Sequence, residues 1–172
     1  HLGNLISEAV DKAGKDGAIT IEPANSSTTS LELIEGFQFD SGYLSPQFVT
    51  DKRRWTMRHE NALVLVSDTT ISAVEQIFPA LQIASREGRA LVIVAEDVQD
   101  QALAALIMNT VRGTMKVAAI RAPGYGEERR ACLEDLASSV GATVLGPAGK
   151  QALSKVDLSL IHISEPTRHD QI

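Results

Sequence analysis

Four short apolar runs, separated by helical patterns, constrain the fold of this chain more than any other feature of its sequence. The strand-like runs lie at residues 62–66, 90–95, 117–120 and 142–145. The helical patterns between them lie at about 71–86, 99–112 and 127–140. Apolar strands that alternate with helices predict an α/β fold, with a mostly parallel sheet flanked by helices through right-handed crossovers.

The part before residue 40 has a different pattern. Residues 4–13 carry apolar side chains at helical spacing, and glycines at 14 and 17 end that pattern. Residues 18–22 and 31–35 read as short strands on either side of a polar loop, so we expect a β-rich N-terminal part. A length of 172 residues suits one domain with a part of a second.

Composition and charge exclude several classes of function. The formal net charge of −6 argues against nucleic acid as a partner, and we interpret the basic cluster Arg53, Arg54 and Arg58 as solvated surface charge. No apolar run reaches membrane-spanning length, and no signal peptide opens the chain. The single cysteine, Cys132, cannot form an internal disulfide. We therefore expect an intracellular soluble protein with no membrane partner.

Motifs for catalysis, metal binding or nucleotide binding are missing from the sequence. The G-x-x-x-x-G-K-[ST] phosphate loop is absent, and the histidines do not form a metal or catalytic cluster. The turn Gly124-Tyr125-Gly126 lies between a predicted strand and a predicted helix, where an anion could bind. An α/β enzyme or ligand-binding domain that holds a phosphorylated ligand at this turn therefore stays open as an alternative.

The predicted helices carry more apolar residues than a core needs. If Ala102, Leu106 and Thr110 face the sheet, then Leu103, Ile107 and Met108 point outward. The helix at 71–86 has Phe78 beside its apolar stripe, and Pro79 inside it predicts a kink or a late start. Two readings stay open: an exposed apolar groove that binds a partner, or helices covered by a further domain.

The segment from Phe37 to Phe48 is rich in aromatic residues, although aromatics make up only 4% of the chain. Gly42 and Pro46 predict turns, so we expect a loop rather than a strand. Such a loop serves either as a small satellite core or as a recognition loop.

Several ordered motifs carry a family resemblance. Residues 39–46, Phe-Asp-Ser-Gly-Tyr-Leu-Ser-Pro, resemble the F-D-R-G-Y-L-S-P signature of GroEL-type group I chaperonins. The resemblance continues, without large gaps from about residue 3 to about 145, through the motifs at 77–81, 95–98, 102–104, 109–113, 116–119 and 122–126. Ser41 replaces the basic residue of the signature, and Gln47 stands at a usually aromatic position.

The resemblance implies a domain organisation. Residues 1–34 would be part of the hinge-like intermediate domain, residues 35–158 a truncated apical substrate-binding domain, and residues 159–172 a disordered or foreign tail outside the family. The family binds ATP and Mg²⁺ in an equatorial domain, whose G-D-G-T-T motif is absent here. We therefore expect no cofactor and no catalytic residue in this chain, whereas its parent would be an ATP-hydrolysing protein-folding isomerase.

The resemblance also implies a function and a set of residues. This piece of a molecular chaperone would bind non-native polypeptides and the co-chaperonin lid through an apolar groove between two helices. The parent would assemble homo-oligomeric rings in the bacterial cytoplasm or in an organellar matrix or stroma. The substrate-binding residues carried over from the family are Tyr43, Ser45, Phe48, Phe78, Leu81, Leu103, Ile107 and Met108.

Overall fold

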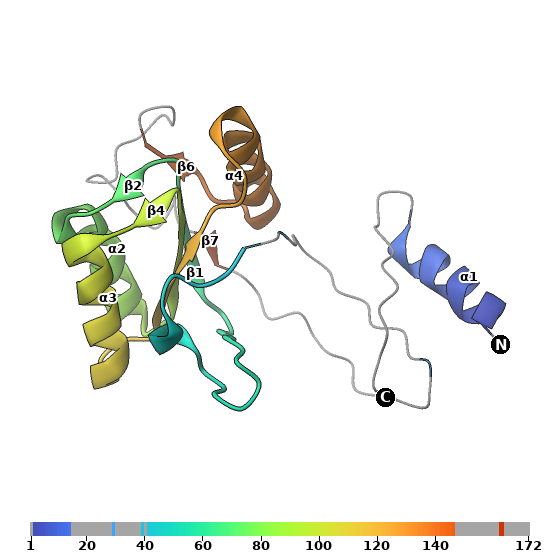
Figure 1. Ribbon diagram of the computed structural model, residues 1–172, viewed down its shortest axis with the longest axis horizontal. Helices are drawn as coiled ribbons and strands as arrows, with labels where there is room; N and C mark the ends of the chain where they lie inside the picture. Colours follow the sequence, from blue (N-terminus) through green and yellow to red (C-terminus); the bar gives the residue numbers. More distant parts are fainter. Residues whose placement is uncertain (1, 15–28, 30–38, 40, 147–161, 164–172) are drawn as a thin grey trace. The chain divides into compact units, whose positions relative to one another are not determined.

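The computed structural model describes residues 2–14, 29, 39, 41–146 and 162–163 of the chain (Figure 1). The chain divides into two compact units, His1–Gly36 and Phe37–Ile172. In the first unit, helix α1 spans Leu2–Ala13, where the spacing of apolar residues predicts a helix. The strands predicted at 18–22 and 31–35 lie outside the described residues. The assignment of the two units to intermediate and apical domains stays a prediction.

A parallel sheet forms the centre of the second unit. Its strands run in the order β5-β3-β1-β6, and all three neighbouring pairs are parallel. The strands are β1 (Leu63–Ser67), β3 (Leu91–Ala95), β5 (Val117–Arg121) and β6 (Val144–Leu145). Because helices cover both faces, β1 and β3 are buried almost throughout, which explains their unbroken apolar sequence. The α/β fold with a mostly parallel sheet is confirmed.

Three two-residue strands complete the described pairing. Strands β2 (Thr70–Ile71) and β4 (Asp97–Val98) form a small parallel sheet of their own, just beyond the carboxyl ends of β1 and β3. Strand β7 (His162–Ile163) pairs antiparallel with β1 at Leu63 and Val64. We expected residues 159–172 to be a disordered or foreign tail, so the sequence did not predict this pairing.

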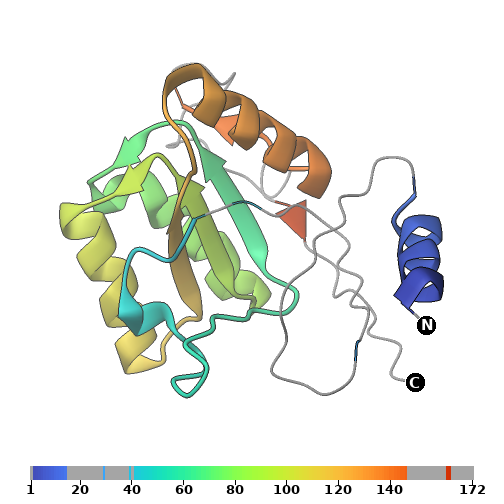
Figure 2. The same ribbon diagram turned by 45° about the vertical axis from the view of Figure 1, so that its right-hand side comes forward.

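Three helices cover the sheet, two on one face and one on the other (Figures 1 and 2). Helices α2 (Val74–Glu87) and α3 (Asp100–Arg112) lie side by side on one face, and α4 (Gly126–Val140) lies on the opposite face. Each helix ends at a glycine in the left-handed conformation. The strand order explains this placement, because right-handed crossovers in opposite directions along a sheet put helices on opposite faces.

Helix α2 begins with a side-chain cap and continues through a proline. The Gln76 side-chain oxygen accepts hydrogen bonds from the backbone N–H groups of Ser72 and Ala73, at 3.1 and 3.0 Å. These bonds satisfy donors that a helix start leaves without intrahelical partners. Pro79 lies inside the helix, which begins at Val74, so the proline does not mark a late start.

Each face of the sheet has its own hydrophobic core. The core under α2 and α3 includes Leu63, Leu65, Ile77 and Leu106, and the core under α4 includes Val66, Val94, Leu133 and Leu136. All of these side chains are buried. No helix among the described residues is both long and apolar enough to cross a membrane.

The aromatic loop packs against the edge strand β5. The backbone N–H of Leu44 donates to the carbonyl oxygen of Ala119 at 2.9 Å, and Tyr43 forms an isolated bridge with Ile120. The short 3-10 helix η1 (Pro46–Phe48) then directs Phe48 into the core, where its exposed fraction is 1%. Phe48 therefore belongs to the main core under α2 and α3 rather than to a separate satellite core.

Candidate functional site

Helix α3 faces the sheet as its sequence predicts. Ala102 and Leu106 are fully buried, and the Thr110 hydroxyl donates to the carbonyl oxygen of Val117 on β5 at 3.2 Å. This orientation leaves Leu103 and Ile107 half-buried at the border of the core. Met108 and Val111 point to the outside, with exposed fractions of 47% and 63%. For Met108 the predicted outward direction is confirmed, whereas Leu103 and Ile107 pack partly against the core.

Helix α2 presents a matching exposed side chain. Ile77, Ala80 and Ala84 are buried against the sheet, whereas the Phe78 side chain is 53% exposed. Because α2 and α3 pack against each other, their outer apolar residues lie on the same side of the sheet. We call this set the apolar helix surface; it consists of Phe78, Leu103, Ile107, Met108 and Val111.

Exposure of these side chains forgoes stabilisation that burial would supply. Full burial of one Phe, Met or Val side chain is worth about 1.5–3 kcal/mol. Scattered exposed apolar residues are ordinary, but several large ones gathered on two adjacent helices are typical of a surface that contacts a partner. Met108 adds adaptability, because its unbranched thioether fits partners of different shapes.

The remaining predicted binding residues contribute little to this surface. Phe48 and Leu81 are buried in the core, with exposed fractions of 1% and 8%, so they offer almost no area to a partner. Ser45 is also buried, and its hydroxyl accepts a bond from the backbone N–H of Gln47 at 3.4 Å. Tyr43 is half-buried against the core. The expectation of an exposed binding role is therefore wrong for Phe48 and Leu81 in this conformation.

Sequence reasoning missed one member of the apolar helix surface. Val111 is among the most exposed large apolar side chains of the described residues. It lies one helical turn beyond Ile107, so the i,i+4 spacing was a usable signal. Val111 lies within the family motif at 109–113, but the binding residues carried over from the family did not include it.

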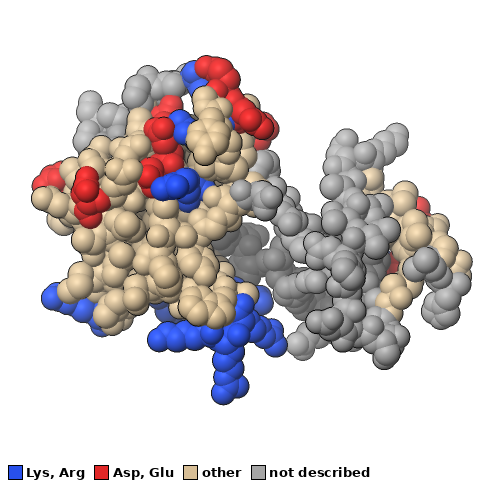
Figure 3. Space-filling model, viewed as in Figure 1, with Lys and Arg blue, Asp and Glu red and all other residues tan. Residues whose placement is uncertain are grey.

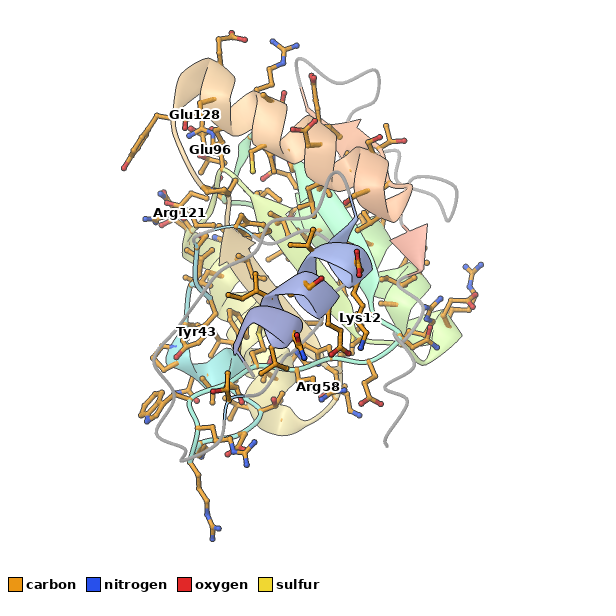
Figure 4. The ribbon with its side chains drawn as sticks, turned by 90° about the vertical axis from the view of Figure 1, so that its right-hand side faces the viewer. Lys12, Tyr43, Arg58, Glu96, Arg121 and Glu128 are labelled. Carbon is orange, nitrogen blue, oxygen red and sulfur yellow. The ribbon has the colours of Figure 1, made fainter. Side chains whose placement is uncertain are left out.

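Ion pairs occupy the carboxyl edge of the sheet. Nη2 of Arg121 lies 2.9 Å from both carboxylate oxygens of Asp97, and Arg129 lies 2.7 Å from Glu96. Figure 4 shows Glu96, Arg121 and Glu128 toward this end of the unit and Arg58 toward the other. These pairs link β5 to β4 and α4 to the residue before β4, and they engage both Arg121 and Arg129.

The pKa of Asp97 reflects these contacts. Burial is the largest single effect, and it raises the pKa. Hydrogen bonds from Gln99, Arg121 and the backbone N–H of Val98, together with the charge of Arg121, outweigh burial. The pKa of Asp97 therefore lies below its ordinary value. The ionised carboxylate links the small β2–β4 sheet to Arg121 on β5.

The turn before α4 offers weak support for a phosphorylated ligand. Tyr125 is the N-cap residue of α4 and is 87% exposed, and Gly124 and Gly126 both have positive φ. The first helical turn carries Glu127 and Glu128, whose carboxylates already benefit from the helix dipole. They would repel an anion at the same place. The alternative ligand-binding function stays a prediction.

The potential metal ligands and the single cysteine of the described residues are further candidates for sites of chemistry. No group of His, Cys, Asp and Glu side chains able to hold a metal ion occurs within the described part of the chain. Burial, followed by the charges of Asp135 and Glu128, raises the pKa of the Cys132 thiol. This shift favours the protonated thiol, which is a poor nucleophile.

Comparison with known proteins identifies the class of fold. No family model matches the chain. Among solved structures, it is similar to the crystal structure of the chaperonin gp146 from the bacteriophage EL 2 (Pseudomonas aeruginosa), in presence of ATP-BeFx. The TM-score is 0.54 at 16% sequence identity, over 94% of this chain. The likeness covers 32% of the chaperonin, so this chain spans about a third of its length. The chain therefore has a chaperonin-like domain fold.

Proposed function

We propose that this chain is the client-binding part of a chaperonin and that it binds non-native polypeptides on the apolar helix surface. The observation that carries the proposal is the exposure of Phe78, Met108 and Val111 on two adjacent helices of a chaperonin-like fold. Non-native chains expose apolar segments, and burying such segments against these side chains is favourable without a fixed geometry. Low specificity follows from the same physics.

The wider assembly belongs to the same proposal. A single apolar patch of this kind binds weakly, so a ring of copies would raise the affinity for one client through avidity. A co-chaperonin lid that inserts apolar side chains would compete with the client for the same surface. The resemblance to group I chaperonins supports both ideas, and it assigns ATP and Mg²⁺ to parts outside this chain. A bacterial cytoplasmic or organellar location is proposed on the same ground.

A binding titration with a matched control tests the proposal. An unfolded, fluorescently labelled model protein is titrated with the chain, with Phe78→Glu/Met108→Glu, and with Ala131→Glu/Ser138→Glu. The control residues are exposed on α4, across the sheet, and add the same charge. We expect the first variant to lose at least about tenfold in affinity, because buried charge opposes apolar association. The control should bind like the parent chain.

Two results would contradict the proposal. Equal loss in both variants would assign the effect to net charge rather than to the apolar helix surface. Unchanged binding by Phe78→Glu/Met108→Glu would place the client elsewhere. Circular dichroism and the thermal midpoint establish that each variant is folded before its affinity is compared.

A further inference from the structure

Charge is unevenly distributed along the strand direction of the second unit. The segments 50–61, 85–90 and 112–117, near the amino-terminal edge of the sheet, hold eight cationic side chains and three carboxylates. The segments 67–76, 96–101 and 121–129, at the opposite edge, hold seven carboxylates and two arginines. Figure 3 shows Lys and Arg gathered at one end of this unit and Asp and Glu toward the other. We call the first region the basic end; its cations are Lys52, Arg53, Arg54, Arg58, Arg86, Arg89, Arg112 and Lys116.

The basic end surrounds a hollow in the surface. A depression of about 840 Å³ opens between the carboxyl ends of α2 and α3 and the segment 48–61. Its wall includes Arg58, Arg89 and Lys116. Burial, followed by the charge of Lys116, lowers the pKa of the nearby His59, which favours its neutral form. The side of the hollow next to both helices is therefore cationic.

Most of these cations have no ion-pair partner among the residues that the structure describes. Within the described residues, Arg58 pairs with Glu60 at 3.5 Å, and Arg89 donates to the backbone and side-chain oxygens of Asn61. No ion pair to a described residue involves the other six, namely Lys52, Arg53, Arg54, Arg86, Arg112 and Lys116.

A tight loop carries two of these cations, Arg53 and Arg54. Asp51 and Thr56 exchange backbone hydrogen bonds of 3.0 and 3.2 Å. One side-chain oxygen of Asp51 accepts from the backbone N–H groups of Arg53 and Arg54, at 2.9 and 3.3 Å. The carboxylate of Asp51 therefore fixes the turn that presents the two guanidinium groups. Trp55 follows them with 64% of its surface exposed.

The basic end is continuous with the apolar helix surface. Arg112 directly follows Val111, and Arg86 lies two turns beyond Phe78 on the same helix. At 1.5 Å per helical residue, the nine residues from Leu103 to Arg112 span about 14 Å. An extended polypeptide covers that distance with about four residues. One extended segment can therefore contact both surfaces.

We infer that the basic end is a subsite for acidic side chains of the same clients. It selects polypeptides that carry carboxylates about four to six residues beyond an apolar stretch. This inference rests on the proposed function. A polypeptide is favoured over a nucleic acid because it places apolar side chains and carboxylates along one strand, as the two adjoining surfaces require. The net charge of the chain does not oppose this, since the Debye length of about 8 Å at physiological salt screens the distant acidic edge.

Three labelled peptides of equal length test the inference with the full chain. Each joins the same apolar stretch and a five-residue neutral spacer to a tail of four Glu, four Gln or four Lys. At 50 mM salt we expect the Glu peptide to bind about tenfold more tightly than the Gln peptide, and the Lys peptide to bind most weakly. At 500 mM salt the three affinities should converge, because exposed charges are then screened.

Substitutions assign the effect to the loop. Arg53→Gln/Arg54→Gln should shrink the preference for the Glu peptide and leave the Gln peptide unaffected, and Arg53→Lys/Arg54→Lys should retain the preference. Lys12→Gln/Arg130→Gln removes the same charge elsewhere and should keep the preference of the parent chain. Each control residue pairs, among the described residues, with a carboxylate one turn away on its own helix.

The outcomes separate the two proposals. Equal binding of all three peptides at low salt overturns the subsite for acidic side chains, but it does not contradict client binding on the apolar helix surface. Failure of the Gln peptide to bind at any concentration overturns the proposed function itself. A single-stranded oligonucleotide that displaces the Glu peptide at lower concentration, and loses binding in Arg53→Gln/Arg54→Gln, overturns the assignment of the subsite to polypeptides.

Discussion

The two faces of the central sheet carry helices of similar length that differ in what they show to the outside. Helices α2 and α3 bury small and aliphatic residues against the sheet and still expose Phe78, Met108 and Val111. Helix α4 buries Leu133, Leu136 and Ala137 in the same way, but its exposed positions are mainly charged and small residues. The fold needs only one apolar stripe per helix, so the surplus on α2 and α3 is not explained by folding.

The inner faces of the two layers should matter equally for stability. Leu106 on α3 and Leu133 on α4 are both fully buried. We expect Leu106→Ala and Leu133→Ala each to lower the free energy of unfolding by about 2–5 kcal/mol, through lost burial and the cavity left behind. Urea denaturation followed by circular dichroism measures this effect. A much smaller loss at one site would show that its layer is only loosely packed.

A glycine beside β6 tests how closely the α4 side of the sheet is packed. Gly146 has φ of 141°, and a Cβ atom there would lie 1.6 Å from a carboxylate oxygen of Asp68. Gly146→Ala must therefore displace the half-buried Asp68 carboxylate and strain the backbone, so we expect the free energy of unfolding to fall by about 1–3 kcal/mol. Gly88→Ala serves as the comparison, since its Cβ would meet nothing within 4 Å. Equal losses in thermal melts would remove the steric explanation.

The outer faces should differ in binding rather than in stability. Val111→Ser removes exposed apolar area from α3, and Ala131→Ser is the matched change on α4. We expect both variants to keep their unfolding free energy within about 0.5 kcal/mol. Only Val111→Ser should weaken client binding, by about two- to threefold, in proportion to the lost apolar contact. Equal affinities for an unfolded protein would contradict the distinction between the two faces.

The smallest expected effect is on stability at low pH, and it concerns Asp97 at the carboxyl edge of the sheet. Because the folded-state pKa of Asp97 lies below its ordinary value, its ionised form stabilises the fold. That contribution is present above the unfolded-state pKa of about 3.9 and is lost as the pH falls through the lower folded-state value. Asp97→Asn should therefore reduce stability at pH 7 and flatten its decline below about pH 4. An unchanged acid transition would show that the contacts of Asp97 are weak.

The sequence predicts the regular elements well and the local packing less well. The alternation of apolar runs and helical patterns locates α2, α3, α4 and the four parallel strands, because each long element repeats one periodicity. Strands β2 and β4 escape prediction because two residues are too few to show a period. Strand β6 is shorter than the apolar run at 142–145 predicts.

In the candidate site too, the sequence predicts residues on regular helices better than residues whose position depends on local packing. Periodicity separates the outward Met108 from the buried Leu106, because the two lie on different sides of one helix. Periodicity cannot predict that Phe78 is exposed and Phe48 is buried, because the burial of a loop residue such as Phe48 depends on contacts distant in the sequence. Phe48 enters the core because Leu44 and Tyr43 pair with β5, and no local pattern encodes that pairing.

Methyl NMR of the chain during titration with an unlabelled unfolded protein tests the central claim most directly. The account predicts shifts or line broadening at Met108, Ile107 and Val111 on α3, while Ala131 and Leu136 on α4 keep their signals. Signal changes spread equally over α3 and α4, or confined to α4, would contradict the assignment of client binding to the apolar helix surface.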